Sequence, residues 1–413
     1  MWLDAPRNPN APLAGLKVLE LARVLAGPWA GQILADLGAD VIKVESPDGD
    51  GTRLWGPPWI ERENGDREAA YYHAANRGKR SIVADFRDAG DLARVAELAA
   101  SADVVLENFK TGTLAKFGLD YAALSAANQG LVYCSITGFG QTGPYAPRAG
   151  YDFMIQAMGG LMSVTGEPDE VPGGGPVKVG VALVDVMTGL YATIGVLAAL
   201  AHRERTGAGQ YIDLALLDVS VATLANQAMN YLVSGKAPGR MGNAHPNIVP
   251  YQAFATQDGH LVLAIGNDEQ FRRFAAEAGH PDWGTDPRFA TNAQRVANRA
   301  ALVPLVAGAV ATRTTDDWIA ALESKAVPCG PINTLDRVFA DPQVQARGLA
   351  RQIAHPALGS VPTVANPLNL SATPVDYARA APRLGADTDE TLGRLLGLDA
   401  AALADLRKRG VIG

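Results

Sequence analysis

Residues 17–45, KVLELARVLAGPWAGQILADLGADVIKVE, decide the fold of this chain. The short apolar runs at 17–21 and 40–45 have the length of buried strands, and 26–37 between them has the spacing of a helix. The alternation continues, with strands expected at 81–85, 103–108 and 131–137 and a helix at 91–101. Short strands alternating with helices pair in parallel. We therefore expect an α/β fold with a large, doubly wound, Rossmann-like domain and a smaller α/β domain.

The segment from Pro176 to Leu217 continues this pattern and contains one isolated carboxylate. Asp185 stands among apolar residues and glycines, ahead of a helical pattern from Met187 to Arg203 and a strand at 211–216. An uncompensated carboxylate in such surroundings is costly, so it must be hydrogen-bonded, exposed at a cleft or used in chemistry. Two interpretations are open at this point, because Asp185 suits a helix N-cap as well as a catalytic role.

The expected domain boundaries lie where this pattern breaks. Glycines and prolines interrupt it after Ser234, in GKAPGRMGNAHPNIVPYQ, which is typical of a linker. We expect a large domain at 1–217 that is completed by 340–413, a linker at 218–245, a small domain at 246–325, a linker at 326–345 and a return to the large domain at 346–413. The stretch 46–78 is expected to be a long loop that carries function.

Composition excludes several classes of protein. The chain has 413 residues, of which 48% are hydrophobic and 19% charged, and its net charge is −7. No large basic cluster is present, so we expect no nucleic-acid partner. The most apolar segment, 189–201, is shorter than a membrane span requires. The N-terminus lacks the pattern of a secretion signal and the two cysteines are far apart, which favours a cytoplasmic protein.

Familiar catalytic motifs give few candidates. GFGQTG at 138–143 matches GxGxxG, but Pro144 and Pro147 follow it, so the helix that a dinucleotide-binding fingerprint needs is not expected. The sequence has no GxSxG elbow, HExxH or CxxC motif, so neither a serine hydrolase nor a metal site is indicated. His73, His245 and His355 stand alone and are interpreted as structural or loop residues.

Several segments in order form a known pattern. They are VLELARVLAGPWAGQILADLGADVIKVE, NRGKRSIVAD, ENFKTGTLAKFGLDY, SITGFGQTGPY, GYDFMIQAMGGLMSVTGEP, the Asp185 segment, GNAHPNIVPYQ and PCGPI. Together, from Leu13 to about Leu398, they resemble the class III CoA-transferases, the family of formyl-CoA transferase and carnitine CoA-transferase (CaiB/BaiF type). WGPPW at 55–59 and the segments from 242 and 328 look most similar to enzymes of the succinate–hydroxymethylglutarate type, which move CoA between dicarboxylic acids.

The resemblance implies a reaction and a set of site residues. It makes Asp185 the nucleophile that moves CoA from an acyl-CoA to a free carboxylic acid through aspartyl anhydride and aspartyl-CoA intermediates. It also implies CoA contacts at Leu25, Ala26, Ala84, Arg87, Asn108, Phe109, Lys110, Lys116, Tyr151 and Asp152. Ser46 stands where many relatives carry an arginine, and Arg53 is the expected substitute. The family's glycine loop matches Gly242-Asn243-Ala244, which keeps only one glycine.

The same resemblance leaves one alternative activity and implies an assembly. α-Methylacyl-CoA racemases share the fold and need a histidine beside an aspartate to move the α-proton. Here the triplet is Gly150-Tyr151-Asp152, and a phenol with a reference pKa of about 10 is a poor base, which favours the transferase. The resemblance also implies an interlocked homodimer, with acyl-CoA and a small carboxylic acid as partners and no metal or membrane.

Overall fold

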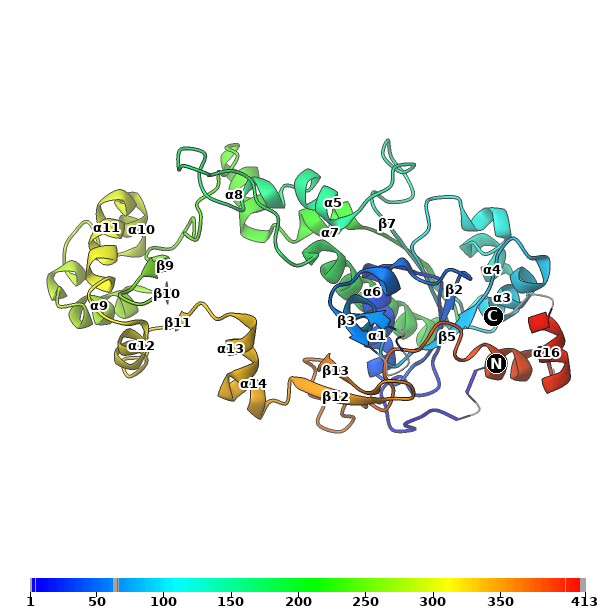
Figure 1. The fold of residues 1–413 in the computed structure, drawn as a ribbon. Helices are drawn as coiled ribbons and strands as arrows, with labels where there is room; N and C mark the ends of the chain where they lie inside the picture. Colours follow the sequence, from blue (N-terminus) through cyan, green and yellow to red (C-terminus); the bar gives the residue numbers. More distant parts are fainter. Residues whose placement is uncertain (1, 4, 62–64, 66, 398, 409–413) are drawn as a thin grey trace. The chain divides into compact units, whose positions relative to one another are not determined.

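The fold is described from a computed structural model, which covers residues 2–3, 5–61, 65, 67–397 and 399–408. The chain folds into two compact units. Unit 1 comprises Met1–Gly160, Val179–Ala225 and Pro342–Gly413, and unit 2 comprises Leu161–Lys178 and Asn226–Asp341. Unit 1 therefore contains both ends of the chain, and the colours of Figure 1 show the blue and red segments within it.

Unit 1 is organised around a six-stranded sheet in the order β5-β2-β1-β6-β7-β8. Every neighbouring pair in this sheet is parallel. The strands are β1 (Lys17–Glu20), β2 (Asp40–Glu45), β5 (Arg80–Val83), β6 (Val104–Glu107), β7 (Val132–Thr137) and β8 (Tyr211–Ala215). Residues of β2, β5, β6 and β7 are buried throughout, as expected of strands covered on both faces. The prediction of an α/β fold with a parallel sheet is confirmed.

Helices cover both faces of the sheet (Figure 1). On one face, α1 (Ala26–Asp36) and α6 (Leu183–Thr206) bury Leu34 and Val196 in one apolar cluster with the strands. On the other, α3 (Ala89–Ala100) and α4 (Tyr121–Ala127) bury Leu98 and Leu124 in a second cluster. Each cluster removes apolar side chains from water, at about 25 cal/mol per Å² of buried apolar area.

Helix α6 is longer than the sequence indicated. It begins at Leu183 rather than Met187, and Ala182 occupies the N-cap position. The N-cap interpretation of Asp185 is therefore wrong, because Asp185 lies inside the first turn. With 24 residues, α6 is also long and apolar enough to pass for a membrane span, contrary to the prediction for 189–201. Its inward residues, however, pack on α1 and the sheet, as those of a core helix do.

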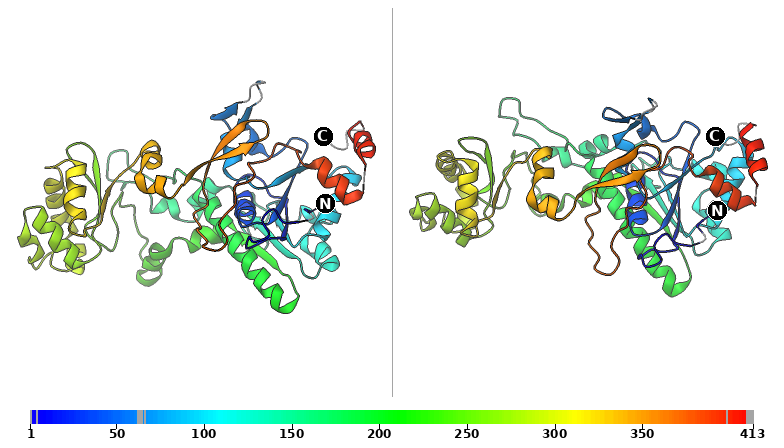
Figure 2. Two further views of the ribbon diagram at one scale, coloured as in Figure 1. Left: turned by 90° about the horizontal axis from the view of Figure 1, so that it is seen from below. Right: turned by 60° about the horizontal axis from the view of Figure 1, so that its bottom comes forward.

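The stretch 46–78, expected to be a loop, contains regular structure. Its elements are η1 (Gly51–Leu54), β3 (Trp59–Glu61), β4 (Arg67–Ala69) and α2 (Ala70–Ala74), and β3 pairs with β4 in a hairpin. The C-terminal part of unit 1 supplies α14 (Pro342–Ala346), the hairpin of β12 (Ala350–His355) and β13 (Gly359–Val364), and the helices α15 (Thr388–Leu396) and α16 (Ala400–Lys408). Figure 2 shows α15 beside the edge strand β5.

Unit 2 has its own core. Its antiparallel sheet has the order β11-β10-β9, formed by β9 (Tyr251–Ala255), β10 (His260–Ala264) and β11 (Cys329–Pro331). Phe271, Phe274 and Trp318 are buried in one apolar cluster against this sheet. The remaining elements are η3 (Leu161–Ser163), α8 (Ala225–Ser234), α9 (Asp268–Glu277), η4 (Pro281–Gly284), α10 (Asn292–Ala297), α11 (Arg299–Val310), α12 (Thr315–Glu323) and α13 (Leu335–Ala340).

Candidate active site

The candidate site lies at the carboxyl ends of the parallel strands. The order of the sheet reverses between β1 and β6, and ligands of open α/β sheets bind where two neighbouring strands lead away in opposite directions. Asn108, just after β6, joins the two loops at this point. Its side-chain oxygen accepts from the Arg23 N–H at 2.9 Å, and its amide donates to the Arg23 carbonyl at 2.6 Å. The loops after β1 and β6 are therefore held together at the switch point.

A cavity of about 290 Å³ at this edge contains Asp185, and we call it the Asp185 cavity. It brings together many of the residues that the sequence predicted, from loops far apart in the chain. These are Leu25, Ala26, Asn108, Phe109, Lys110, Tyr151 and Asp185. Asp152 is buried next to the cavity, at the start of α5 (Asp152–Met158).

Asp152 supports the N-terminus of α6 directly beneath Asp185. Its Oδ1 accepts from the N–H groups of Val184 at 2.8 Å and Asp185 at 3.2 Å, and its Oδ2 accepts from the Gln156 amide at 2.6 Å. Because the first N–H groups of a helix have no partner within it, a carboxylate here replaces the missing cap. Asp152 thereby fixes the backbone that carries Asp185.

The surroundings change the acidity of Asp185. Burial disfavours its charged form, and the nearby Asp152 adds like-charge repulsion, so that the pKa of Asp185 rises from 3.8 to about 7. Burial and these two carboxylates also raise the pKa of Tyr71, a phenol on α2. A weakly solvated carboxylate that ionises near neutral pH is suited to act as a nucleophile.

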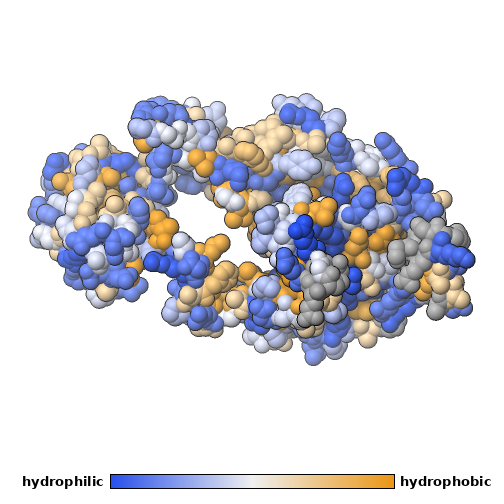
Figure 3. All heavy atoms as spheres, in the orientation of Figure 1, coloured by the Kyte–Doolittle hydropathy of each residue, from blue (hydrophilic) through white to orange (hydrophobic). Residues whose placement is uncertain are grey.

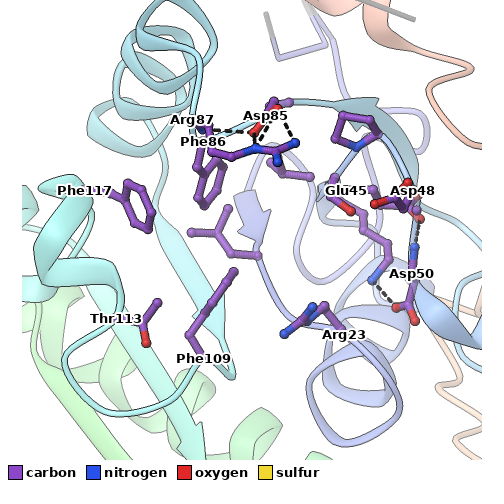
Figure 4. A pocket seen from close by; sticks show the side chains of 17 residues that line it. Arg23, Glu45, Asp48, Asp50, Asp85, Phe86, Arg87, Phe109, Thr113 and Phe117 are labelled. Atoms are coloured by element: carbon purple, nitrogen blue, oxygen red, sulfur yellow. Dashed lines mark hydrogen bonds and ion pairs between the residues drawn. The ribbon is translucent and has the colours of Figure 1, made fainter.

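A second cavity, of about 420 Å³, adjoins the first, and we call it the aromatic cavity. Figure 4 shows the rings of Phe86, Phe109 and Phe117 along one side of it. Arg23 and Phe109 line both cavities, and the Arg23 guanidinium carbon lies 5.4 Å from the centre of the Phe109 ring. A long ligand that fills one cavity could therefore extend past this pair into the other.

The predicted cations do not all lie in the cavities. Arg87 lines the aromatic cavity with Ala84 and pairs with Asp85 at 2.8 Å (Figure 4). Lys110 lines the Asp185 cavity. Lys116 is exposed on η2 (Leu114–Phe117) and lines neither of the two cavities described here.

Arg53 does not stand in for the arginine that Ser46 replaces. Its Nε and Nη2 donate to the two carboxylate oxygens of Glu45 at 2.9 and 2.7 Å, and Nη2 also donates to the Tyr72 hydroxyl at 2.6 Å. The Arg53 guanidinium is thus hydrogen-bonded to other side chains of the protein, whereas Ser46 lines the aromatic cavity. Arg23, which sequence reasoning missed, supplies a cation there, and its place directly after the first strand was the available signal.

A network of buried charges lies behind the loop after β1. The Lys43 ammonium pairs with Glu20 and Asp50, each at 3.0 Å, and donates to the Ala22 carbonyl at 2.7 Å. The Lys79 ammonium pairs with the other oxygen of Glu20 at 2.8 Å. Such groups are stable in a core only when they are paired and hydrogen-bonded. No local pattern in the sequence identified this network.

Two further expectations concern loops. No helix opens at Gly143, and the Gln141 N–H instead donates to Asp213 at 3.0 Å, so 138–143 does not form a dinucleotide-binding turn. Gly242 belongs to unit 2, where its N–H donates to the Gly166 carbonyl at 3.0 Å, and a lid role for this loop stays a prediction. Within the described part of the chain, no cluster of three His, Cys, Asp or Glu side chains is arranged to hold a metal ion.

Comparison with known proteins gives a consistent result. A family model described as CoA-transferase family III matches residues 13–388. The chain is 53% identical over 401 residues to a succinate–glutarate CoA-transferase of Agrobacterium fabrum, covering 97% of this chain and 99% of the relative. It is 41% identical over 416 residues to the human succinyl-CoA:glutarate CoA-transferase, covering 100% and 93%. A crystal structure of a CAIB/BAIF family protein from Brucella suis superimposes with a TM-score of 0.82 at 55% identity, covering 94% of this chain and 100% of that one.

Proposed function

Because this chain belongs to CoA-transferase family III, it is an enzyme that moves CoA between acyl-CoA thioesters and dicarboxylic acids, and we propose that Asp185 carries the transfer. The observation that supports this role is a partly buried carboxylate, with a pKa raised to about 7, in a cavity at the carboxyl edge of the sheet. Succinate and glutarate, which occur in the relatives' names, are the acids to assay first.

The proposed reaction has four steps. An oxygen of Asp185 attacks the thioester carbonyl of the donor, and the carbon–sulfur bond breaks to give a mixed anhydride and CoA thiolate. The thiolate attacks the aspartyl carbonyl, releasing the donor acid and leaving an aspartyl-CoA thioester. The acceptor carboxylate attacks this thioester and expels the thiolate, forming a second anhydride. The thiolate then attacks the acceptor's carbonyl, which yields the new acyl-CoA and restores the Asp185 carboxylate.

Each of these steps passes through an oxyanion that needs hydrogen-bond donors. The N-terminus of α1 offers them, because the first N–H groups of a helix have no partner within it and the end of the helix carries partial positive charge. Leu25 and Ala26, at the start of α1, line the same cavity as Asp185. We therefore assign oxyanion stabilisation to the backbone of this turn.

The remaining length of CoA is assigned to the aromatic cavity. Adenine stacks well on aromatic rings, which Phe86, Phe109 and Phe117 provide. Arg23 and Arg87 then provide charge for the phosphates, because guanidinium groups bind phosphate oxygens in pairs. The pantetheine arm would pass from this cavity along Arg23 and Phe109 to Asp185.

A racemase activity is less well supported. The side chain that would have to act as the partner base is Tyr151, which is 67% exposed at the N-terminus of α5. A neutral phenol there could hold a substrate oxygen by a hydrogen bond but would not remove an α-proton. The curated relatives described above are also named as transferases.

We further propose that the enzyme is a cytoplasmic, interlocked homodimer whose large domain spans 1–217 and 340–413. Apolar side chains on the surface of unit 1 support a subunit contact, and Figure 3 shows apolar patches among hydrophilic surface. The exposed apolar side chains of α5, α6 and α7 (Leu216–Ala222) are those of Phe153, Met158, Leu190, Tyr191, Ile194 and Val221. Cys134 and Cys329 are both free, as is usual for proteins of a reducing compartment.

Replacement of Asp185 tests the assignment. Asp185→Ala should lose CoA transfer from succinyl-CoA to glutarate by several powers of ten, because the covalent partner is gone. Asp316→Ala, at an exposed position on α12 in unit 2, is the control and should transfer normally. Trapping with hydroxylamine followed by mass spectrometry should place the adduct on the Asp185 peptide. Substantial transfer by Asp185→Ala would disprove the role.

A further inference from the structure

Val24 has a backbone conformation that its side chain disfavours. Its φ is 72°, in the left-handed region, which a β-branched residue rarely adopts. It lies in the loop between β1 and α1 and lines the Asp185 cavity. Strained residues persist only where their surroundings hold them, and they cluster at functional sites. The surroundings of Val24 must therefore supply the restraint.

Asp50 provides that restraint from a different loop. The Val24 N–H points at the Asp50 carboxylate, 3.2 Å from Oδ2 and 3.4 Å from Oδ1. Asp50 is buried, and its Oδ2 pairs with Lys43 at 3.0 Å. The same ammonium group donates to the Ala22 carbonyl at 2.7 Å. Asp50 and Lys43 thus hold the backbone of the loop after β1 through two hydrogen bonds.

The conformation of Val24 affects the reacting groups through the first turn of α1. The Trp29 N–H donates to the Leu25 carbonyl at 2.7 Å, so the first turn of α1 starts directly after Val24. A change of φ at Val24 would rotate the backbone of Leu25 and Ala26, which line the cavity beside Asp185. Asp50 itself touches the loop and lines the other, aromatic cavity (Figure 4).

We propose that Asp50 is a positioning residue for CoA transfer. By accepting the Val24 N–H, it keeps the β1–α1 turn in its left-handed form and aims the first N–H groups of α1 at the oxyanion that forms beside Asp185. This inference rests on the proposed function of that turn. It predicts that the loss of Asp50 impairs the chemical step more than the binding of CoA.

The test uses Asp50→Asn. The Val24 N–H and the Lys43 ammonium both contact Oδ2, and the Thr52 N–H donates to Oδ1 at 3.0 Å, so the NH₂ group of asparagine opposes an N–H donor in either orientation. The substitution also removes the negative charge that pairs with Lys43. We expect kcat for succinyl-CoA and glutarate to fall about 10- to 100-fold, the effect of a small misplacement at a catalytic site. The Kd for free CoA should stay within about threefold of the wild-type value. Thr52→Val, which removes a hydroxyl that donates to Asp50 at 2.9 Å but leaves the Val24 contact, is the matched control and should keep kcat.

Rescue by glycine separates positioning from general damage. Glycine adopts a φ near 72° without strain, so Val24→Gly in the Asp50→Asn background should recover a large part of kcat. If Asp50→Asn fails to fold, Asp50→Glu takes its place with the same expected rescue. The inference is overturned if kcat is unchanged, if only the Kd for CoA changes, or if Val24→Gly gives no recovery. A wild-type protein without any CoA transfer would instead refute the proposed function.

Discussion

Replacing Asp185 with asparagine should stabilise the folded protein, and more so as the pH rises. Burial and Asp152 raise the pKa of this carboxyl from 3.8 to about 7. The folded chain therefore binds the proton more tightly than the unfolded chain does. Stability from this group is lost as the pH rises from about 4 to about 7 and stays at its lower level above that range. Asparagine has nearly the same shape but no charge, so it does not suffer this loss.

The size of the effect follows from the same two pKa values. At about 1.4 kcal/mol per pKa unit, a rise from 3.8 to about 7 corresponds to at most roughly 4 kcal/mol. Solvent reaches part of the Asp185 side chain and screens its charge, so we expect about half of this, about 2 kcal/mol at pH 8. At roughly 2 °C per kcal/mol for a domain of this size, the Tm should rise by about 4 °C.

Thermal unfolding of both proteins at pH 4.5 and pH 8 measures the difference. The Tm of Asp185→Asn should exceed that of the wild type at pH 8, and most of the excess should be gone at pH 4.5. Protein concentration must be the same throughout, because oligomers unfold in a concentration-dependent way. Asp316→Asn, at an exposed position on α12, is the control and should show no such dependence on pH. A Tm difference of equal size at both pH values, or a more stable wild type at pH 8, would refute the reasoning.

Four further predictions concern activity and assembly. Since the ionised form of Asp185 is the nucleophile, kcat/KM should rise with pH and level off above a pKa near 7, and a profile that falls between pH 5 and 8 would contradict this role. Tyr151→Phe should slow transfer less than about tenfold, because a neutral hydrogen bond contributes about 0.5–1.5 kcal/mol. In deuterium oxide, NMR should show no enzyme-dependent exchange at the α-carbon of a 2-methylacyl-CoA, and exchange as fast as transfer would restore the racemase. Tagged and untagged dimers mixed under native conditions should form no hybrids over hours, and rapid exchange would rule out interlocked subunits.

The sequence predicted the elements of the large sheet well, because buried parallel strands are short apolar runs bounded by helices. The strand expected at 17–21 is observed as Lys17–Glu20, and the one expected at 131–137 as Val132–Thr137. These patterns are local, because the apolar residues of each segment indicate that this same segment is buried. The family resemblance is confirmed for a related reason, since the matching segments lie in order along nearly the whole chain.

The same local reasoning failed where the structure depends on contacts between loops. The hairpin of β3 and β4 lies in a stretch rich in Gly, Pro and aromatic residues, which looked irregular. Nothing near Asp185 in the sequence indicates that Asp152, 33 residues away, accepts its N–H. Nor does any pattern connect Asp50 to Val24, 26 residues away, although both lie at the candidate site. Hydrogen bonds between a side chain and a distant loop produce no periodic pattern in the sequence.

The return of the chain to unit 1 has a physical reason at the edge of the sheet. Strand β5 is the outermost strand, so its outward N–H groups have no strand to pair with. Side chains of the C-terminal segment accept them instead, Asp387 from the Ser81 N–H at 2.9 Å and Thr388 from the Val83 N–H at 3.1 Å. The loop that follows β5 carries Ala84 and Arg87 into the aromatic cavity. Residues more than 300 positions later in the sequence thus bind the edge strand β5. The loop that follows this strand forms one wall of the aromatic cavity.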